Sequence, residues 1–175
     1  HGKYCKWTNT TEPSASALWS DATPTINTAS INALVPNIIY TFATVAAMQS
    51  ASTLIDGAIY NTLGYYSRGD GGNASYYYSS TSTTIPNDSG SLFYPAGISG
   101  SNAGRFVWLR QKDVNVRQFG CKGDGSDDTN AFQGAIGYAE SFTNALPVYV
   151  PPGKYVVSGL TLRKTGIYGN CTLPY

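Results

Sequence analysis

The sequence predicts a mainly β protein with short helices. Short runs of β-branched and aromatic residues alternate with turns rich in Gly, Pro, Asn and Ser, which is the pattern of short strands joined by tight turns. Near the C-terminal end these runs recur at steps of about six to seven residues, which leaves no room for helices between them. One longer amphipathic stretch, after Asp128, predicts a helix of about three to four turns.

The composition limits the classes of protein to which the chain can belong. It has 175 residues, of which 12% are charged, and a formal net charge of +1. That length suits one or two small domains. Because no basic stripe is present we predict no nucleic-acid partner, and because no long apolar run is present we predict no membrane span. The 19 Gly and 14 Tyr, with abundant Ser, Thr and Asn, are typical of extracellular or virion β proteins.

The three cysteines, Cys5, Cys121 and Cys171, are widely spaced. Their odd number argues against a closed disulfide framework, and they form no CxxC pair and no metal-ligand spacing. We therefore expect buried free thiols. We predict neither a metal site nor a cofactor.

Residues 1–35 show the least regular pattern in the chain. Trp7, Leu18 and Trp19 stand among Thr, Ser, Ala and Asn residues with few charges. One interpretation is an extended N-terminal arm that docks on a partner, with these three residues as candidate anchors. The other is a flexible linker, and the sequence leaves both open.

Residues 36–110 are predicted to form a small β-rich module. Thr44 can cap a short helix at Val45–Ser50 by accepting a hydrogen bond from a free N–H group of its first turn. Phe106 and Trp108 are two residues apart, so they should lie on one face of a strand. The expected strands lie within Leu54–Leu63, Ala74–Ser79 and Gly104–Arg110, and a tight loop is expected at Gly69–Gly72.

The module also contains a cluster of tyrosines. Tyrosine rings can stack on the C–H faces of sugars, but they more often fill cores and subunit interfaces. The sequence leaves both roles open for Tyr65, Tyr66, Tyr76, Tyr77 and Tyr78.

Residues 111–175 contain the stretch around which the chain is organised, Asp113–Ala135. The alternating run of Val114, Val116 and Phe119 predicts a short strand. A turn of glycines and acids then follows up to Asp128. Its two glycines, Gly123 and Gly125, can adopt positive φ at little cost.

The acids of this turn, Asp124, Asp127 and Asp128, suit the start of a helix. Asp127 or Asp128 can accept a hydrogen bond from the free N–H groups of the first helical turn. Negative charges are also favourable at the positive end of the helix dipole. The apolar residues that follow recur at helical spacing, and they place Phe132 and Ile136 on the core face. The same face contains Ala135, Ala139 and either Phe142 or Thr143.

Four short strands are expected after the helix. Strands of about four residues at this spacing suit either a meander or the rungs of a solenoid. A stack of one or two coils cannot bury its own core, so we expect these residues to be the N-terminal part of a longer polypeptide. The expected strands are Leu146–Val150, Tyr155–Ser158, Leu160–Arg163 and Ile167–Gly169.

Two stretches within residues 113–169 resemble a known family. They read DVNVRQFGCKGDGSDDTNAFQGAI and PVYVPPGKYVVSGLTL, and they are similar to the start of the right-handed parallel β-helix in the pectate-lyase-like superfamily. The resemblance implies a capping helix followed by the first coils. Because the acids of this motif are structural in that superfamily, it implies a structural role for Asp124, Asp127 and Asp128. Cys121 stands where alanine is usual.

A second resemblance lies within Thr41–Tyr78. The pattern TVAAM, followed by LIDGAIYNTLGYYSRGDGGNASYYY, is similar to the small domain that precedes the β-helix in many phage tailspikes. The two resemblances together imply the N-terminal anchoring part of a tailspike, located in the virion tail. The implied partners are tail or baseplate proteins for the N-terminal part and two further copies of the chain. Host surface polysaccharide would be bound by a C-terminal part beyond Tyr175.

An enzymatic interpretation stands beside this one. The full polypeptide would be a virion or secreted polysaccharide hydrolase or lyase, such as a capsule depolymerase. Glycosidases need two carboxylates across the scissile bond, and Glu12 and Glu140 are the only glutamates in the chain. We therefore predict no catalytic residue here and place any catalytic groups beyond Tyr175. A third interpretation, a secreted pectinase-like protein, is disfavoured by Thr41–Tyr78.

Overall fold

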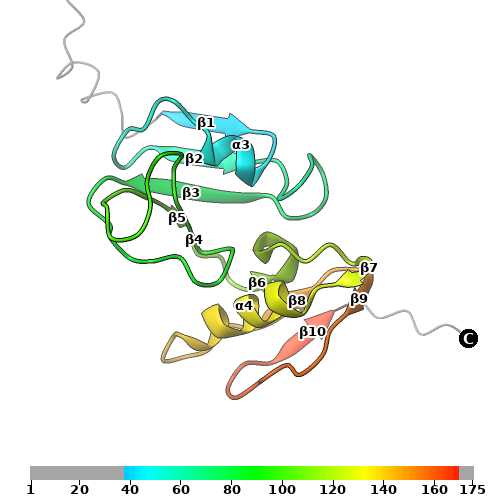
Figure 1. Ribbon diagram of the computed structural model, residues 1–175. Helices are drawn as coiled ribbons and strands as arrows, with labels where there is room; N and C mark the ends of the chain where they lie inside the picture. Colours follow the sequence, from blue (N-terminus) through cyan, green and yellow to red (C-terminus); the bar gives the residue numbers. More distant parts are fainter. Residues whose placement is uncertain (1–37, 170–175) are drawn as a thin grey trace, which may run out of the picture. The chain divides into compact units, whose positions relative to one another are not determined.

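The computed structural model describes residues 38–169, which belong to one compact unit (Figure 1). The candidate anchors Trp7, Leu18 and Trp19 lie outside the described residues, as do Cys5 and Cys171. We call residues 38–110 the β module and residues 111–169 the coil stack. The domain boundaries at 35 and 110 stay predictions.

The β module contains one sheet of five strands in the order β1-β2-β3-β5-β4. The first two strands are parallel and the other neighbours are antiparallel. Along β3, buried side chains alternate with less buried ones, as a half-buried strand requires. Phe106 and Trp108 are both buried, which confirms that they lie on one face of their strand. They pair with Tyr78 and Tyr76 of β3. The strands are β1 (Ile39–Phe42), β2 (Ile59–Thr62), β3 (Ala74–Ser79), β4 (Leu92–Phe93) and β5 (Arg105–Trp108).

The predicted short helix is present as α3 (Val45–Gln49). The Thr44 hydroxyl accepts a hydrogen bond from the N–H group of Ala47 at 3.1 Å, which caps the first turn. Val45 and Met48 are buried, so the helix covers the parallel pair β1–β2 with its apolar side.

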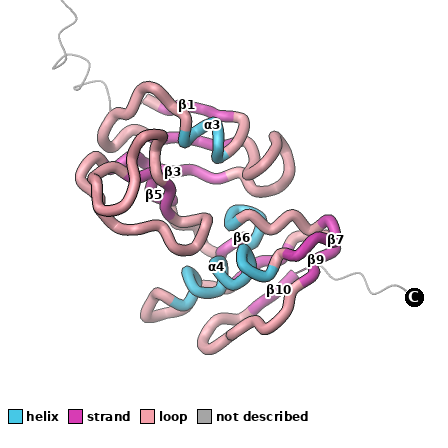
Figure 2. Tube along the Cα trace, in the orientation of Figure 1, coloured by secondary structure: helices cyan, strands magenta, loops and turns pink. Residues whose placement is uncertain are grey.

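The coil stack contains two parallel sheets, in the orders β10-β8-β6 and β7-β9. Each passage of the chain adds a strand to one sheet and then to the other, which defines a parallel β-helix and excludes a meander (Figure 2). The elements are β6 (Val114–Asn115), the 3-10 helix η2 (Val116–Phe119), β7 (Asp124–Asp127), α4 (Thr129–Glu140), β8 (Val148–Val150), β9 (Lys154–Val156) and β10 (Ile167–Gly169).

Three local predictions need correction. The alternating run is a strand only at Val114–Asn115, because the chain turns into a 3-10 helix at Val116–Phe119. The acidic segment Asp124–Asp127 is an irregular strand rather than a turn, although Gly123 and Gly125 do adopt positive φ of 63° and 96°. Pairing with β9 therefore extends a segment that its composition marked as a turn.

The predicted strand Leu160–Arg163 is not a strand. Its backbone bonds to side chains of α4 instead of to a neighbouring strand. Gln133 donates to the carbonyl of Thr161 at 3.1 Å and accepts from its N–H group at 2.8 Å. Glu140 accepts from the N–H groups of residues 163–165. The helix thus satisfies the backbone groups that a sheet would otherwise pair.

One column of the coil stack runs through all three coils. Val114 lies beside Val148 and Val148 beside Ile167 in the parallel register. Val114 and Val148 are completely buried, whereas Ile167 is 43% exposed. The core column therefore ends at an uncovered apolar side chain on the last described strand.

Candidate functional site: the junction between module and coil stack

The loop Gly69–Asn73 is one of the parts of the β module that meet the coil stack. Asp70 fixes its shape, because its carboxylate accepts hydrogen bonds from the N–H groups of Tyr65, Tyr66, Ser67 and Gly72 at 2.7–3.0 Å. Burial alone would raise the pKa of Asp70, but these four donors together lower it below its ordinary value of 3.8. The loop is therefore organised around an ionised carboxylate.

Three side chains of the coil stack bind the carbonyl groups of this loop. The Arg117 guanidinium donates to the carbonyl of Asp70 at 2.7 Å. Asn115 donates to that of Gly71 at 3.2 Å, and Gln118 to that of Asn73 at 2.8 Å. These bonds join the glycine motif of the module to the residues that precede the capping turn.

The backbones approach too closely at this point for any side chain on Gly72. A Cβ atom there would lie 2.5 Å from the carbonyl oxygen of Arg117. Gly71 has a φ of +85° and also lies against the Arg117 side chain. The junction therefore explains Gly72 and adds to the constraint on Gly71.

Arg117 also ties the junction to the second coil. Its guanidinium donates to the carbonyl of Pro152 at 2.8 Å and to the hydroxyl of Tyr155 at 3.1 Å. A planar guanidinium can serve acceptors in several directions at once. One side chain therefore connects the module loop, η2 and the β8–β9 turn.

Two tyrosines add further bonds beside the junction, and one of these bonds crosses it. The hydroxyl of Tyr65 donates to the carbonyl of Ser89 within the module at 2.8 Å, and that of Tyr66 to the carbonyl of Gly120 at 3.0 Å. Burial raises the pKa of Tyr65 to about 12. The Lys122 ammonium lies 5.4 Å from the centre of the Tyr66 ring, so this ring already has a cationic neighbour.

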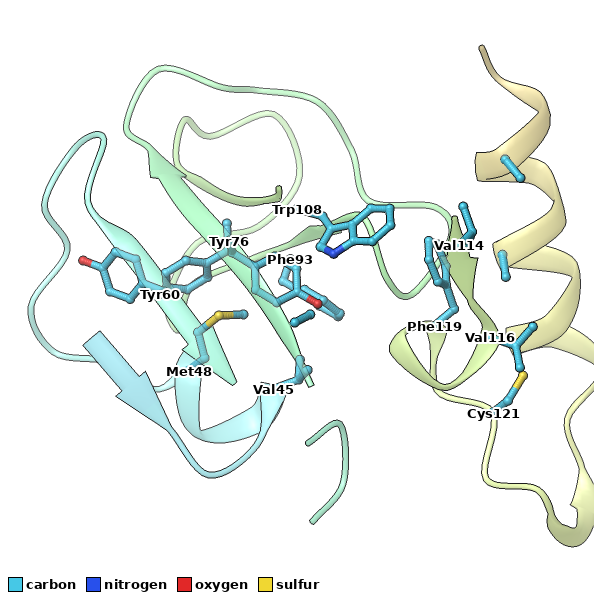
Figure 3. Packing of buried hydrophobic residues seen from close by; sticks show 14 of the residues in the cluster. Val45, Met48, Tyr60, Tyr76, Phe93, Trp108, Val114, Val116, Phe119 and Cys121 are labelled. Atoms are coloured by element: carbon cyan, nitrogen blue, oxygen red, sulfur yellow. The ribbon is translucent and has the colours of Figure 1, made fainter. Parts of the chain in front are cut away.

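The apolar core is continuous across the junction (Figure 3). Trp108 of the module packs against Phe119 and Tyr138 of the coil stack, with ring centres 5.8 Å and 5.2 Å apart. Both pairs meet edge to face, a favourable geometry for aromatic rings. Hydrogen bonds and core contacts therefore hold the two parts in one arrangement.

The residues of the predicted capping turn divide into distinct roles. Asp128 is 3% exposed, and its carboxylate accepts from the N–H groups of Lys122 at 2.7 Å and Gly123 at 3.0 Å. Asp127 accepts from the N–H group of Thr129 at 2.9 Å, in the first turn of α4. Asp124 accepts from the N–H and hydroxyl groups of Ser126.

On α4 itself, Phe132 and Ile136 are buried with Ala135 and Ala139. Phe132 packs against Tyr155 of β9, with ring centres 6.2 Å apart. Cys121 lies just before the turn as a buried free thiol, as expected, and burial raises its pKa to about 12. A thiol with so high a pKa is a weak nucleophile.

The described carboxylates all accept hydrogen bonds from the chain. Of the ten Asp and Glu residues, Glu12 and Asp21 lie outside the described residues, which leaves eight. Five of these, including Glu140 and Asp56, have a lowered pKa because they accept hydrogen bonds. A general acid for glycoside cleavage needs a raised pKa, so these five groups are unsuited to that role.

Within residues 38–169 we find no cluster of three potential metal ligands. Nor does this part of the chain contain a helix with the length and apolar character needed to cross a membrane.

Sequence reasoning did not identify the residues of the junction. The sequence pattern does not single out Asp70, Arg117 or Gln118, although their bonds define the contact. The sequence does contain one signal, because the polar residues Asn115, Arg117 and Gln118 interrupt the apolar run of Val114, Val116 and Phe119.

The fold and the junction define a protein in which a small β module is fixed to the capped first coils of a parallel β-helix. The family model "Rhamnogalacturonase A/epimerase, pectate lyase-like" matches residues 113–174. The resemblance of these residues to the pectate-lyase-like superfamily is therefore confirmed.

Similar solved structures are tailspikes and related β-helix proteins. The tailspike gp49 of Acinetobacter baumannii bacteriophage Fri1, a capsular polysaccharide depolymerase, matches with a TM-score of 0.64 and 20% identity, over 75% of this chain and 23% of its own. The enzymatically active domain of tailspike protein 2 from bacteriophage CBA120 matches with a TM-score of 0.56 and 20% identity, over 81% and 20%. At 20% sequence identity, the similarity between this chain and these two structures shows a shared fold and nothing further.

Two bacterial proteins are also similar to parts of this chain. WceF of Pantoea stewartii, a glycan biofilm modifying enzyme with a tailspike-like β-helix, matches with a TM-score of 0.51 and 17% identity, over 66% of this chain and 16% of its own. The phage-related protein YobO of Bacillus subtilis (strain 168) is 43% identical over 51 residues, which is 29% of this chain and 6% of YobO. The chain thus spans less than a quarter of these relatives.

Proposed function

We propose that these residues are the N-terminal anchoring part of a phage tailspike. In this role the module and the residues before it bind tail or baseplate proteins of the virion. The coil stack begins a β-helix whose later coils engage host surface polysaccharide. The full protein would be a host-adhesion protein of the virion tail.

The junction is the observation that carries this proposal. A protein that attaches at one end and binds the host at the other must transmit force and orientation between its parts. Arg117 and Gln118 fix the module loop to the first coil, and Trp108 extends the core across the boundary. Such a contact suits a rigid connector better than two independent domains.

The open end of the coil stack supports the second half of the proposal. Ile167, at the end of the core column, is 43% exposed, and Val156 and Leu162 are 46% and 49% exposed. Both sheets also end there in strands with one unpaired edge, β10 and β9. Further coils of the same polypeptide would cover these side chains and edges.

A homotrimer is part of the proposal through the resemblance to tailspikes. Low charge and many tyrosines suit a surface that is buried between copies. Light scattering of the full-length protein at micromolar concentration should give the mass of three copies, and a monomer would contradict this part.

Attachment can be tested with virions that lack their own tailspike. The full 175-residue chain is mixed with these virions and sedimented with them. We expect the chain in the pellet, bound to tails, and in the supernatant when virions with intact tailspikes are used. A chain that stays in the supernatant with both kinds of virion would contradict the anchoring role.

A second candidate function is favoured by the names of the similar structures, which include a capsular polysaccharide depolymerase and a glycan biofilm modifying enzyme. The full polypeptide would then be a polysaccharide hydrolase or lyase, in the virion or secreted. Because the described carboxylates serve structural hydrogen bonds, we place its catalytic groups beyond Tyr175. Release of reducing ends from capsular polysaccharide by the 175-residue chain would contradict this placement.

A further inference from the structure

A long connection joins β3 to β5 in the module. It spans residues 80–104 and contains only one short strand, β4. Connections longer than about 12–15 residues with so little secondary structure are uncommon in compact domains, and they are usually either functional or disordered. In this one, residues 81–85 and 99–103 are almost all exposed, yet hydrogen bonds hold both segments in place. We call the two segments together the Arg105 surface, after the residue that holds them.

Arg105 lies under this surface as a buried cation. Its side chain is completely buried, and among the described residues no carboxylate accepts a hydrogen bond from it. The guanidinium lies 4.3 Å from the centre of the Tyr94 ring. Its hydrogen bonds, at 2.5–3.2 Å, go to the backbone carbonyls of Thr83, Thr84, Gly100, Asn102 and Gly104. Because a buried cation is unfavourable unless its donors are satisfied, these carbonyls must stay arranged around it.

The same bonds fix the two segments to one another. The guanidinium binds carbonyls of both segments at once. Gly104 adds a direct link, because its N–H group donates to the carbonyl of Ser82 at 2.9 Å. The Arg105 surface therefore has one fixed shape, and a surface of this kind loses little conformational entropy when it binds a partner.

The Arg105 surface contains no charged residue. Its segments read TSTTI and SGSNA. The single charged side chain of the connection that contains them, Asp88, is buried. Ile85 is 61% exposed, more than any other large apolar side chain in the described part of the chain. Because the centres of protein–protein interfaces are poor in charged residues, a rigid, uncharged surface with an exposed isoleucine fits a protein partner.

The position of the Arg105 surface also suits a partner. β5 begins at Arg105 and ends at Trp108, whose ring packs against the coil stack. In the antiparallel strand β3, Arg105 pairs with the last residue, Ser79, whereas the first residue, Ala74, directly follows the junction loop (Figure 1). The surface is therefore at the other end of the β3–β5 pair from the junction loop, and a partner bound there leaves the coil stack free to continue.

We propose that the Arg105 surface binds a protein of the virion tail, with Ile85 inserted into an apolar pocket of that protein. The inference rests on the anchoring role proposed above, and it names the part of the module that makes the contact. The contact consists of apolar packing and of hydrogen bonds from Ser, Thr and Asn side chains, because neither segment is charged. Salt should therefore weaken attachment only slightly.

Ile85→Lys tests this surface, and Ile39→Lys is its matched control. The two isoleucines are almost equally exposed, at 61% and 60%, but Ile39 lies on β1, outside the Arg105 surface. Lysine is common on exposed edge strands of natural proteins, so the control should fold normally. Circular dichroism and thermal unfolding check that both variants are folded.

Attachment is measured by sedimenting the full 175-residue chain, at increasing concentrations, with virions that lack their own tailspike. We expect the native chain and Ile39→Lys to bind with the same apparent affinity. Ile85→Lys should bind roughly tenfold more weakly, because a charge would enter an apolar pocket. An increase in NaCl from about 0.1 to 0.5 M should change the affinity of the native chain by less than about threefold.

The outcomes separate this inference from the anchoring role. Equal binding of the native chain and folded Ile85→Lys would overturn the inference and leave the anchoring role in place. Equal losses in the two lysine variants would overturn the assignment to the Arg105 surface, and a steep fall of affinity with salt would contradict an uncharged contact. A native chain that does not sediment with these virions would contradict the anchoring role and the inference together.

Discussion

Asp127 and Asp128 have different roles, although the sequence left open which of them caps the helix. Asp128 turns its buried carboxylate back to the N–H groups of Lys122 and Gly123. Asp127 binds the first turn of α4 through Thr129. Neighbouring acids therefore stabilise the strand before the helix and the helix itself.

This division predicts unequal costs of substitution. Asp128→Ala leaves two N–H groups without their acceptor, so we expect it to lower the free energy of unfolding by about 2–3 kcal/mol. Asp127→Ala removes a single bond at an exposed site and should cost clearly less. Urea unfolding of both variants gives the comparison, and an equal or reversed order would contradict these roles.

Asp70 should make the stability of the module depend on pH. Its folded-state pKa is lower than the ordinary value of 3.8, so the ionised form contributes stability that is fully present above 3.8. This stability is lost as the pH falls through the lower, folded-state value. Asp70→Asn cannot show this loss, because its amide does not titrate.

The test compares the free energy of unfolding of both proteins between about pH 2 and 7. We expect a constant difference in favour of the native protein at neutral pH and a shrinking difference in acid. A difference that is the same at all pH values would show that the charge of Asp70 has no part in fixing the loop.

At the scale of elements, α4 is both the cap of the coils and the partner of two loops. Its buried face was predictable, because Phe132, Ile136 and their neighbours recur at helical spacing. The partners of its outer face were not predictable, because Gln133 and Glu140 bond to segments more than 20 residues away in sequence. Periodicity reports which side of a helix is apolar, and it contains no information about such distant partners.

The two glycines on this outer face have opposite predicted effects. Gly137 has open space, so Gly137→Ala should raise the free energy of unfolding by about 1 kcal/mol through better helix propensity. At Gly134 a Cβ atom would lie 2.4 Å from the carbonyl oxygen of Asp88. Gly134→Ala must therefore displace the Asn87–Ser91 segment, and we expect it to cost about 1–3 kcal/mol. Thermal unfolding separates the two, and stabilisation by both would contradict the close contact at Gly134.

The strands show where local pattern suffices and where it fails. Ala74–Ser79 forms the predicted strand because its alternation matches a half-buried sheet. Asp124–Asp127 has the composition of a turn, yet it is a strand because Lys154–Val156 pairs with it. The parallel β-helix itself followed from the family resemblance, since residue spacing alone also allowed a meander.

At the scale of the molecule, the junction explains why the two motifs of the sequence occur together. In the glycine loop of the module, Gly72 lies so close to the backbone of Arg117 that no side chain fits there. The arrangement of module and coils therefore depends on bonds between segments about 45 residues apart in sequence, such as the bond from Gln118 to Asn73.

Arg117→Ala should weaken this arrangement more than any other single change at the surface. The variant loses the bonds to Asp70, Pro152 and Tyr155, and we expect a cost of about 3 kcal/mol. Hydrogen exchange of the backbone amides of residues 69–73 and 153–155 should accelerate together. Arg68→Ala, at an exposed position directly before the loop Gly69–Asn73, is the control and should have little effect.

The anchoring role is the central claim, and its most direct test is the location and size of the native protein. Purified virions are probed with an antibody raised against residues 36–110. We expect a band far above 18.6 kDa in virions, with the antibody decorating tails in electron micrographs. A protein found only in the culture medium, and in no virion, would contradict the claim and favour a secreted polysaccharide-degrading enzyme.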